Sequence, residues 1–301
     1  MTAPAVFWPT FLGLSFLTAG IITYRRDLHA ATSREAFGLV ALGPAFVAAS
    51  LAAFAGEHFT AARSLAELVP RWMPARLFIA YFVGVAHLAA ALSFVARRYI
   101  RWSAIFLALM FALFVLLMDL PAALRHPAIQ LYWILAARQA TFAMGALALF
   151  ATAIRKHRPL SSNTLAAIAR IWVAGVLIFY GIDHILRPQY LPGVPGNKLT
   201  SAWVPLPLVI AYATGILLIA FGIGMFVKKY AGSGGTLAGL WMVLLTLSLY
   251  VPEFFLAHNV PQRVTAINFV FDTLLFAGTI LLITKAILDT ESRPIAMSHA
   301  T

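Results

Sequence analysis

Long apolar stretches without charged side chains constrain the fold of this sequence more than any other feature. A bilayer hydrocarbon core about 30 Å thick requires roughly 20 apolar residues in a helix, because every backbone polar group must be satisfied inside the segment. The stretches are unbroken runs of Leu, Ala, Val and Phe, without the alternation that is typical of membrane β-barrels. The predicted fold class is therefore an all-α polytopic membrane protein with about nine transmembrane helices. The expected spans are Val6 to Tyr24, Ala36 to Ala55, Leu77 to Ala96, Trp102 to Met118, Ile129 to Ile154, Leu165 to Ile182, Trp203 to Val227, Gly235 to Val251 and Val264 to Lys285.

Charged residues make up only 11% of the 301 residues, whereas soluble chains carry roughly 25%. The net charge of +12 comes from basic residues in short clusters between the apolar stretches, and not along one polar face. The composition therefore indicates a lipid bilayer as partner and excludes an ordinary soluble domain, and nucleic acid is not expected to bind. The chain has no cysteine, which excludes disulfides, thiolate metal sites and cysteine nucleophiles.

Basic residues predict how the chain is oriented, because cytoplasmic loops are enriched in Lys and Arg. With nine spans, fourteen basic residues fall on one side, seven on the other, and Arg138 inside a span. This split predicts a multi-pass protein of the cell inner (plasma) membrane with the N-terminus outside and the C-terminus in the cytoplasm. The fourteen are Arg25, Arg26, Arg34, Arg97, Arg98, Arg101, Arg155, Lys156, Arg158, Arg170, Lys228, Lys229, Lys285 and Arg293. The seven are Arg63, Arg71, Arg76, Arg125, Arg187, Lys198 and Arg263.

The sequence also contains an internal repeat. Glu57-His58 and Asp183-His184 are acidic-His pairs 126 residues apart. Further matches lie 131 residues apart, and the extra five residues fall in a loop rich in Pro and Gly. These matches are Trp72-Met73-Pro74 with Trp203-Val204-Pro205, Tyr81 and Gly84 with Tyr212 and Gly215, and Pro121 with Pro252. Each unit would hold four helices, an even number, so both units would insert with the same orientation, related by an axis along the membrane normal.

The repeat divides the chain into a predicted N-terminal anchor helix with a cytoplasmic loop (1–33), a first four-helix unit (34–158), a second four-helix unit (159–288) and a cytoplasmic tail (289–301). The first segment is expected to be a retained helix, because no basic residue precedes it and an Arg pair, not a cleavage site, follows it. The stretch Gly232-Ser233-Gly234-Gly235 is expected to be a flexible loop.

The second unit resembles the DoxX-like membrane proteins, which are four-helix units. The residues that carry the resemblance are Tyr180-Gly181-Ile182-Asp183-His184, Arg187-Pro188, Trp203-Val204-Pro205-Leu206-Pro207, Tyr212-Ala213-Thr214-Gly215 and Gly222-Ile223-Gly224. The chain resembles two such units in tandem over residues 36 to 287. The family often carries a glutamate three residues after the helix-two glycine, where this chain has Leu218 in the second unit and His87 in the first. The resemblance implies an association with membrane redox complexes.

Five titratable residues form the first set of candidate sites. Glu57 with His58, and Asp183 with His184, would end the first helix of each unit on the outer side, where they could relay protons, hold a polar ligand or simply cap the helices. His87 lies mid-span on the stripe of Tyr81 and Gly84. It could ligate heme, but no second mid-span His offers an opposite ligand, so heme is not expected. No metal site is predicted either, since zinc needs three or four converging ligands.

The deepest polar residues form the second set. Arg138 and Gln139 lie in helix four of the first unit, and Asn268 and Asp272 lie at comparable depth in helix four of the second. A charge at this depth is costly until it is paired, which predicts an Arg138 to Asp272 bridge between the units, with Asp119 or Glu57 as alternative partners of Arg138. The group could be a structural lock or a substrate site.

Three functions are consistent with these residues. The first is an accessory or ligand-binding subunit of a membrane redox system that holds a lipid or quinone-like molecule near the histidines. The second is a scaffold without a ligand, whose outer loops engage a periplasmic or membrane partner. The third is a small-solute carrier with a cavity between the two units. No recognisable nucleophile, phosphate-binding loop or dinucleotide motif indicates an enzyme, and the sequence leaves the oligomeric state open.

Overall fold

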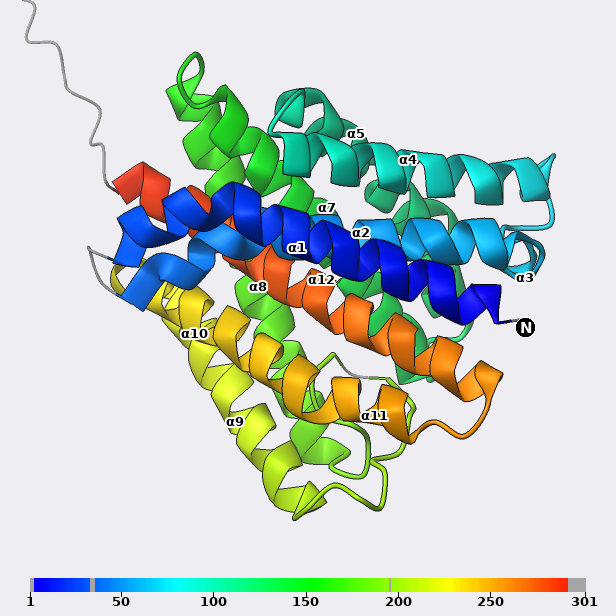
Figure 1. Cartoon of the computed structure of the whole chain (residues 1–301). Helices are drawn as coiled ribbons and strands as arrows, with labels where there is room; N and C mark the ends of the chain where they lie inside the picture. The colour runs from blue at the N-terminus through cyan, green and yellow to red at the C-terminus, as the bar shows by residue number, and fades with distance from the viewer. Residues whose placement is uncertain (1–2, 33–35, 195, 292–301) are drawn as a thin grey trace, which may run out of the picture.

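The computed structural model describes residues 3–32, 36–194 and 196–291. These residues contain nine helices that are long and apolar enough to cross a membrane (Figure 1). The predicted all-α fold class and its spans are thereby confirmed. A single bridge between Tyr190 and Leu199 is the one extended pairing in these residues. The predicted loop residue Arg34, and Arg293 with most of the tail after residue 289, lie outside the described residues.

Most spans are single helices. They are α1 (Pro4–Thr32), α4 (Arg76–Ala96), α7 (Gln130–Ile154), α8 (Pro159–Leu186), α9 (Pro207–Phe226) and α12 (Val260–Glu291). The second span begins with a 3₁₀ segment, η1 (Ala36–Leu42), and continues as α2 (Gly43–Thr60); the short α3 (Ala62–Leu68) follows it outside the span. The fourth span consists of α5 (Ile100–Phe114), the π-helical turn η2 (Val115–Asp119) and α6 (Leu120–Arg125). The eighth consists of η3 (Lys228–Tyr230), α10 (Ala231–Leu245), the π-helical turn η4 (Thr246–Tyr250) and α11 (Val251–Leu256).

The two predicted units pack against each other through their fourth helices. Helices α7 and α12 contact one another, and each also packs on the first helix of the other unit, α7 on α8 and α12 on α2. Helix α1 lies outside this arrangement, against α2, and Figure 1 shows it running across α2 and α12. Such reciprocal contacts are what a two-fold relation between similar units produces. They support the repeat, which remains a prediction.

Local backbone features recur at the same spacing of 131 residues. Ala75 and Leu206, each directly before the second helix of its unit, both have positive φ angles, of 50° and 47°. The two π-helical turns also lie 131 residues apart, and a proline, Pro121 or Pro252, follows each turn by two residues. A proline cannot donate to the carbonyl four residues earlier and its ring clashes with that carbonyl, so the wider turn relieves both problems.

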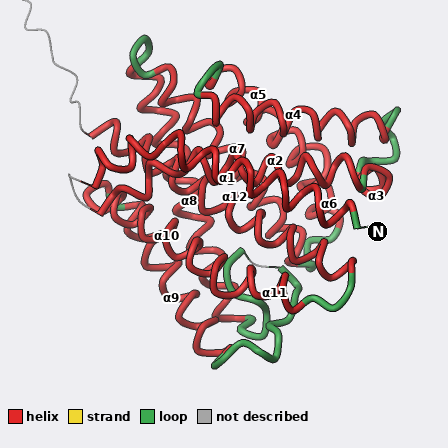
Figure 2. The backbone as a smooth tube through the Cα atoms, in the orientation of Figure 1, coloured by secondary structure: helices red, strands yellow, loops and turns green. Residues whose placement is uncertain are grey.

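The outer connections differ between the units. The longest non-helical segment, 187–206, joins α8 to α9 and lies beside α11 (Figure 2). The Tyr250 hydroxyl donates to the Pro192 carbonyl at 2.9 Å and fixes this segment to η4. This hydrogen bond therefore holds the part of the loop around Pro192 against the eighth span.

The glycine stretch 232–235 was expected to be a loop. This prediction is wrong, because the stretch forms the first turns of α10 and is mostly buried. A Cβ atom on Gly235 would lie 2.1 Å from the Thr284 hydroxyl, and one on Gly232 would lie 2.7 Å from Leu288. The glycines thus allow α10 to approach α12 closely, which is the usual role of small residues between membrane helices.

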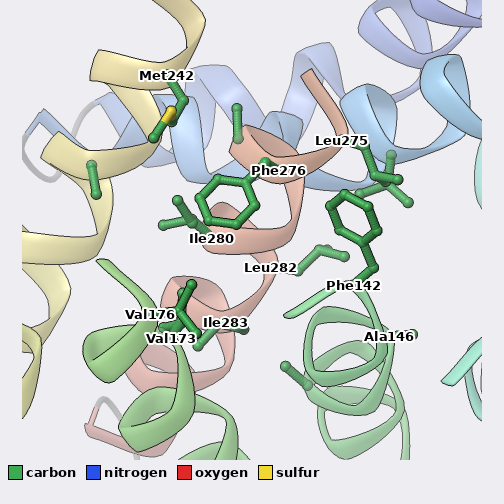
Figure 3. Packing of buried hydrophobic residues seen from close by; sticks show 14 of the residues in the cluster. Phe142, Ala146, Val173, Val176, Met242, Leu275, Phe276, Ile280, Leu282 and Ile283 are labelled. Carbon is green, nitrogen blue, oxygen red and sulfur yellow. The ribbon is translucent and has the colours of Figure 1, made fainter. Parts of the chain in front are cut away.

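The core between the units is apolar near the middle of α7 and α12. Phe276 of α12 lies near Phe142 of α7 and stacks on Tyr180 of α8, with ring centroids 6.4 and 5.6 Å away. Figure 3 shows Phe276 and Ile280 between the α10 side and the α7 and α8 side of this cluster. Further along α12, the buried Thr279 side chain lies against Gly145 of α7.

Candidate functional site

The deepest polar contact joins the two units directly. Arg138 of α7 donates from Nη1 to Asp272 Oδ2 of α12 at 2.7 Å, and the Asp272 side chain is only 8% exposed. This is the predicted bridge. Asp119, at the end of η2, lies within charge-interaction range of Arg138 but forms no ion pair with it, and its Oδ2 is buried without a hydrogen-bond partner among the described residues. Gln139 is half-buried and does not join the pair.

A second kind of contact links each acidic residue at the outer end of a first helix to the fourth helix of the other unit. Asn268 Nδ2 of α12 donates to Glu57 Oε2 of α2 at 3.0 Å. Gln130 Nε2 of α7 donates to Asp183 Oδ1 of α8. We call these two contacts the amide clasps. Sequence reasoning singled out Asn268 but missed Gln130, because the two amides do not occupy equivalent positions of the repeat.

The histidines divide between the units. His58 Nδ1 lies 2.8 Å from the carbonyl oxygen of Ala80 and donates to it, and the His58 ring meets that of His87 edge to face, with centroids 5.5 Å apart. His184 Nε2 lies 3.0 Å from the Gly193 carbonyl oxygen in the second unit. The structure therefore brings His58 and His87 together and records no contact of His184 with either of them among the described residues.

His87 is buried and has no hydrogen-bond partner for either ring nitrogen within the described chain. Phe54 and Phe111 lie at ring-centroid distances of 6.2 and 6.0 Å from it. The His87 imidazole therefore lies in a mostly aromatic surrounding.

The matched glycines Gly84 and Gly215 lie where the second helix of each unit approaches the first. A Cβ atom on Gly84 would lie 2.7 Å from His58 Cβ, and one on Gly215 would lie 2.8 Å from the Gly181 carbonyl oxygen and 3.4 Å from His184 Cβ. In both units the glycine of the second helix therefore faces the histidine of the first. The close approach of the helices requires a residue without a side chain at this point.

A cleft on the outer side was not predicted. It encloses about 620 Å³ around Lys198, Trp203, Glu253, His258 and Gln262. The Lys198 ammonium pairs with Glu253, and the Trp203 indole N–H donates to Glu253 Oε1 at 2.8 Å. Trp203, predicted to begin the seventh span, lies in the loop before α9 and donates to this carboxylate. Nothing in the sequence marked Glu253 as a site residue, except that it follows Pro252, the proline matched with Pro121 in the repeat.

An apolar groove runs between α7 and α8 at mid-span. It encloses about 550 Å³ and is lined by Ala137, Met144, Ile168, Ile171, Trp172, Gly175, Val176 and Phe179. The Trp172 indole N–H donates to Thr141 Oγ1 at 3.1 Å, which fixes the ring at the groove wall. A Cβ atom on Gly175 would meet no atom within 4 Å, so the groove is open at this position.

Arg170, counted among the loop residues in the sequence, lies inside α8. Its guanidinium donates to the Met225 and Phe226 carbonyls at 2.7 and 2.9 Å, which have no partners within α9 because the helix ends there. The residue therefore caps the C-terminal end of α9.

Within the described chain, no group of three or more His, Cys, Asp or Glu side chains could hold a metal ion. Comparisons of the chain with protein families, with curated proteins and with solved structures gave no match. The geometry itself offers paired charges between the units, a pair of histidines of which His87 is buried, a polar cleft and an apolar groove.

Proposed function

We propose that this polytopic membrane protein is a DoxX-like accessory subunit of a membrane redox system, and that it binds a lipid or quinone-like molecule. The DoxX-like residues of the second unit support the assignment. The recurrence of π-helical turns and of histidine-glycine contacts in both units supports a tandem arrangement of two such modules.

The groove between α7 and α8 is the observation that carries the ligand proposal. Its volume of about 550 Å³ is within the range of roughly 300 to 1,000 Å³ that is usual for small-molecule sites. Its walls are apolar and carry two aromatic rings, those of Trp172 and Phe179. A flat ring with an isoprenoid tail could stack on the indole and lay its tail along the groove. This placement moves the ligand away from the histidines, near which the sequence had located it.

Tryptophan fluorescence tests this proposal. Titration of the purified protein with a short-chain quinone should quench emission saturably, and Trp172→Phe should remove most of the saturable component that the seven tryptophans share. Gly175→Leu should weaken binding about tenfold or more, since it fills the groove without striking a neighbour. Thermal unfolding in detergent serves as the control for folding. Non-saturable quenching, or equal quenching without Trp172, would contradict the proposal.

A scaffold is the second candidate function, and the outer cleft favours it. The cleft presents an ion pair, a half-exposed tryptophan and several amide and hydroxyl groups toward the outer side. Such mixed polar and aromatic surfaces are common at protein interfaces. Co-purification after mild solubilisation, compared between the natural chain and Trp203→Ala, tests it. A partner retained equally by both would contradict a role for this cleft.

A further inference from the structure

The two acidic residues of the repeat differ in one respect. Asp183 has a cation of its own, because Arg187, four residues later, pairs with it at 2.8 Å. The residue four positions after Glu57 is Ala61. Arg187 and Ala61 are each the first residue after their helix. The Arg187 N–H group donates to the Asp183 carbonyl and the Ala61 N–H group to the Glu57 carbonyl, both at 2.8 Å. Ala61 therefore occupies the place of Arg187 without its charge.

A pocket lies where the first unit lacks this guanidinium. It encloses about 220 Å³ between the outer ends of α1, α2, α3 and α12. The residues that line it are Ala5, Glu57, Thr60, Ala61, Ser64, Leu65, Val264, Thr265 and Asn268. They include one carboxylate, three hydroxyls and one amide, and no basic side chain.

Glu57 has no countercharge among the described residues. Its Oε2 accepts a hydrogen bond from Asn268, while its Oε1 is buried without a hydrogen-bond partner in the described part of the chain. Arg138, for which Glu57 was one of the predicted partners, is paired with Asp272. A buried carboxylate without a cation is costly, and a ligand that supplies the cation would remove this cost.

We propose that this pocket binds a small organic cation, a guanidinium or a primary ammonium group, which does for Glu57 what Arg187 does for Asp183. The volume corresponds to several water molecules of about 30 Å³ each, which suits such a group better than a bare metal ion. The Glu57 carboxylate pairs with the cation, and the hydroxyls of Thr60, Ser64 and Thr265 accept its remaining N–H groups.

Calorimetric titration of the purified protein with methylguanidinium and with methylammonium, in detergent, tests the proposal. At least one of the two should bind saturably with one site per chain. Glu57→Gln should weaken binding about tenfold or more, as expected for the loss of a charged hydrogen-bond partner. Ala61→Arg should abolish binding, because the new side chain fills the pocket with a tethered guanidinium. The matched control Ala202→Arg adds the same charge at an exposed residue outside the pocket and should bind as the natural chain does.

The second unit provides the converse experiment. Arg187→Ala removes the cation from Asp183 and should create a second binding site for the same probe. Probe binding measured in phosphatidylcholine nanodiscs, with and without phosphatidylethanolamine, distinguishes a lipid headgroup from a free solute as the natural cation. Competition by phosphatidylethanolamine would support the site with a lipid headgroup as occupant, and binding that is independent of it would support the site with a free solute.

The proposal is overturned if folded natural protein binds neither probe, or if Ala61→Arg, shown to be folded, binds as well as the natural chain. Loss of quinone binding has no bearing on it, because the groove between α7 and α8 and the Glu57 pocket share no residue.

Discussion

Arg138 and Asp272 are costly residues to place in a membrane, and the structure shows why the chain tolerates them. A charge at mid-span costs about 2.5 to 3.5 kcal/mol on insertion scales, so such residues face the protein interior and are paired. Here the pair joins α7 to α12 at 2.7 Å, about one helical turn before Phe142 and Phe276 of the aromatic cluster between these helices. This geometry favours the lock over the substrate site, since each charge has its partner within the chain.

Arg138→Leu should lower the free energy of unfolding by about 3 kcal/mol or more, because it leaves Asp272 buried without a countercharge. Replacing both residues with leucine should recover most of this loss. Arg97→Leu is the matched control, since its pair with Asp27 is nearly half exposed and should contribute under about 1 kcal/mol. Thermal unfolding in detergent measures all three. Equal losses for Arg138→Leu and Arg97→Leu would exclude the lock.

The sequence predicted the members of this pair but could not choose between Asp272, Asp119 and Glu57 as partner of Arg138. Depth along a helix is readable from the sequence, but the rotation of one helix against another is not. The same limit explains why the Glu253 contacts with Lys198 and Trp203 were missed. They join a long loop to α11, 50 to 55 residues further on in the chain.

At the scale of the helices, close packing depends on particular glycines. Gly84→Ala should lower the free energy of unfolding by about 1 to 3 kcal/mol, since the new methyl group would meet His58 Cβ at 2.7 Å and the Phe59 ring at 2.9 Å. Gly175→Ala is the control and should raise it by up to about 1 kcal/mol, because the site is open and alanine favours a helix. Unfolding in detergent compares the two. A harmless Gly84→Ala would disprove the proposed role of the glycine.

Helix existence was predictable from apolar length, and all nine spans were found, but their interruptions were not. A π-helical turn needs a wider backbone, and Pro121 and Pro252 indicate only that the helix must be disturbed nearby. The glycine stretch 232–235 was misread for a related reason. Glycine favours loops when it is exposed, whereas between packed helices the same residue permits contact, and the sequence alone does not distinguish these settings.

At the scale of the whole molecule, the amide clasps link the units unequally. Asn268→Leu should destabilise the protein by about 2 kcal/mol or more, because Glu57 then has no remaining hydrogen-bond partner among the described residues. Gln130→Leu should lower the free energy of unfolding by about 1 kcal/mol less than Asn268→Leu does, because Asp183 keeps its ion pair with Arg187. Combining Asn268→Leu with Glu57→Leu should restore stability. Equal effects of the two amide substitutions, measured by thermal unfolding, would contradict this inequality.

The central claim is that two similar four-helix units lie side by side with the same orientation, so that both acidic-His ends face outward. The chain has no cysteine, so single cysteines at Ser64 and Ala202 can be labelled without background. A membrane-impermeant maleimide added to intact cells should label both positions, while Lys156→Cys should react only after permeabilisation. If either Ser64→Cys or Ala202→Cys is labelled only in permeabilised cells while the other reacts in intact ones, the parallel arrangement is wrong.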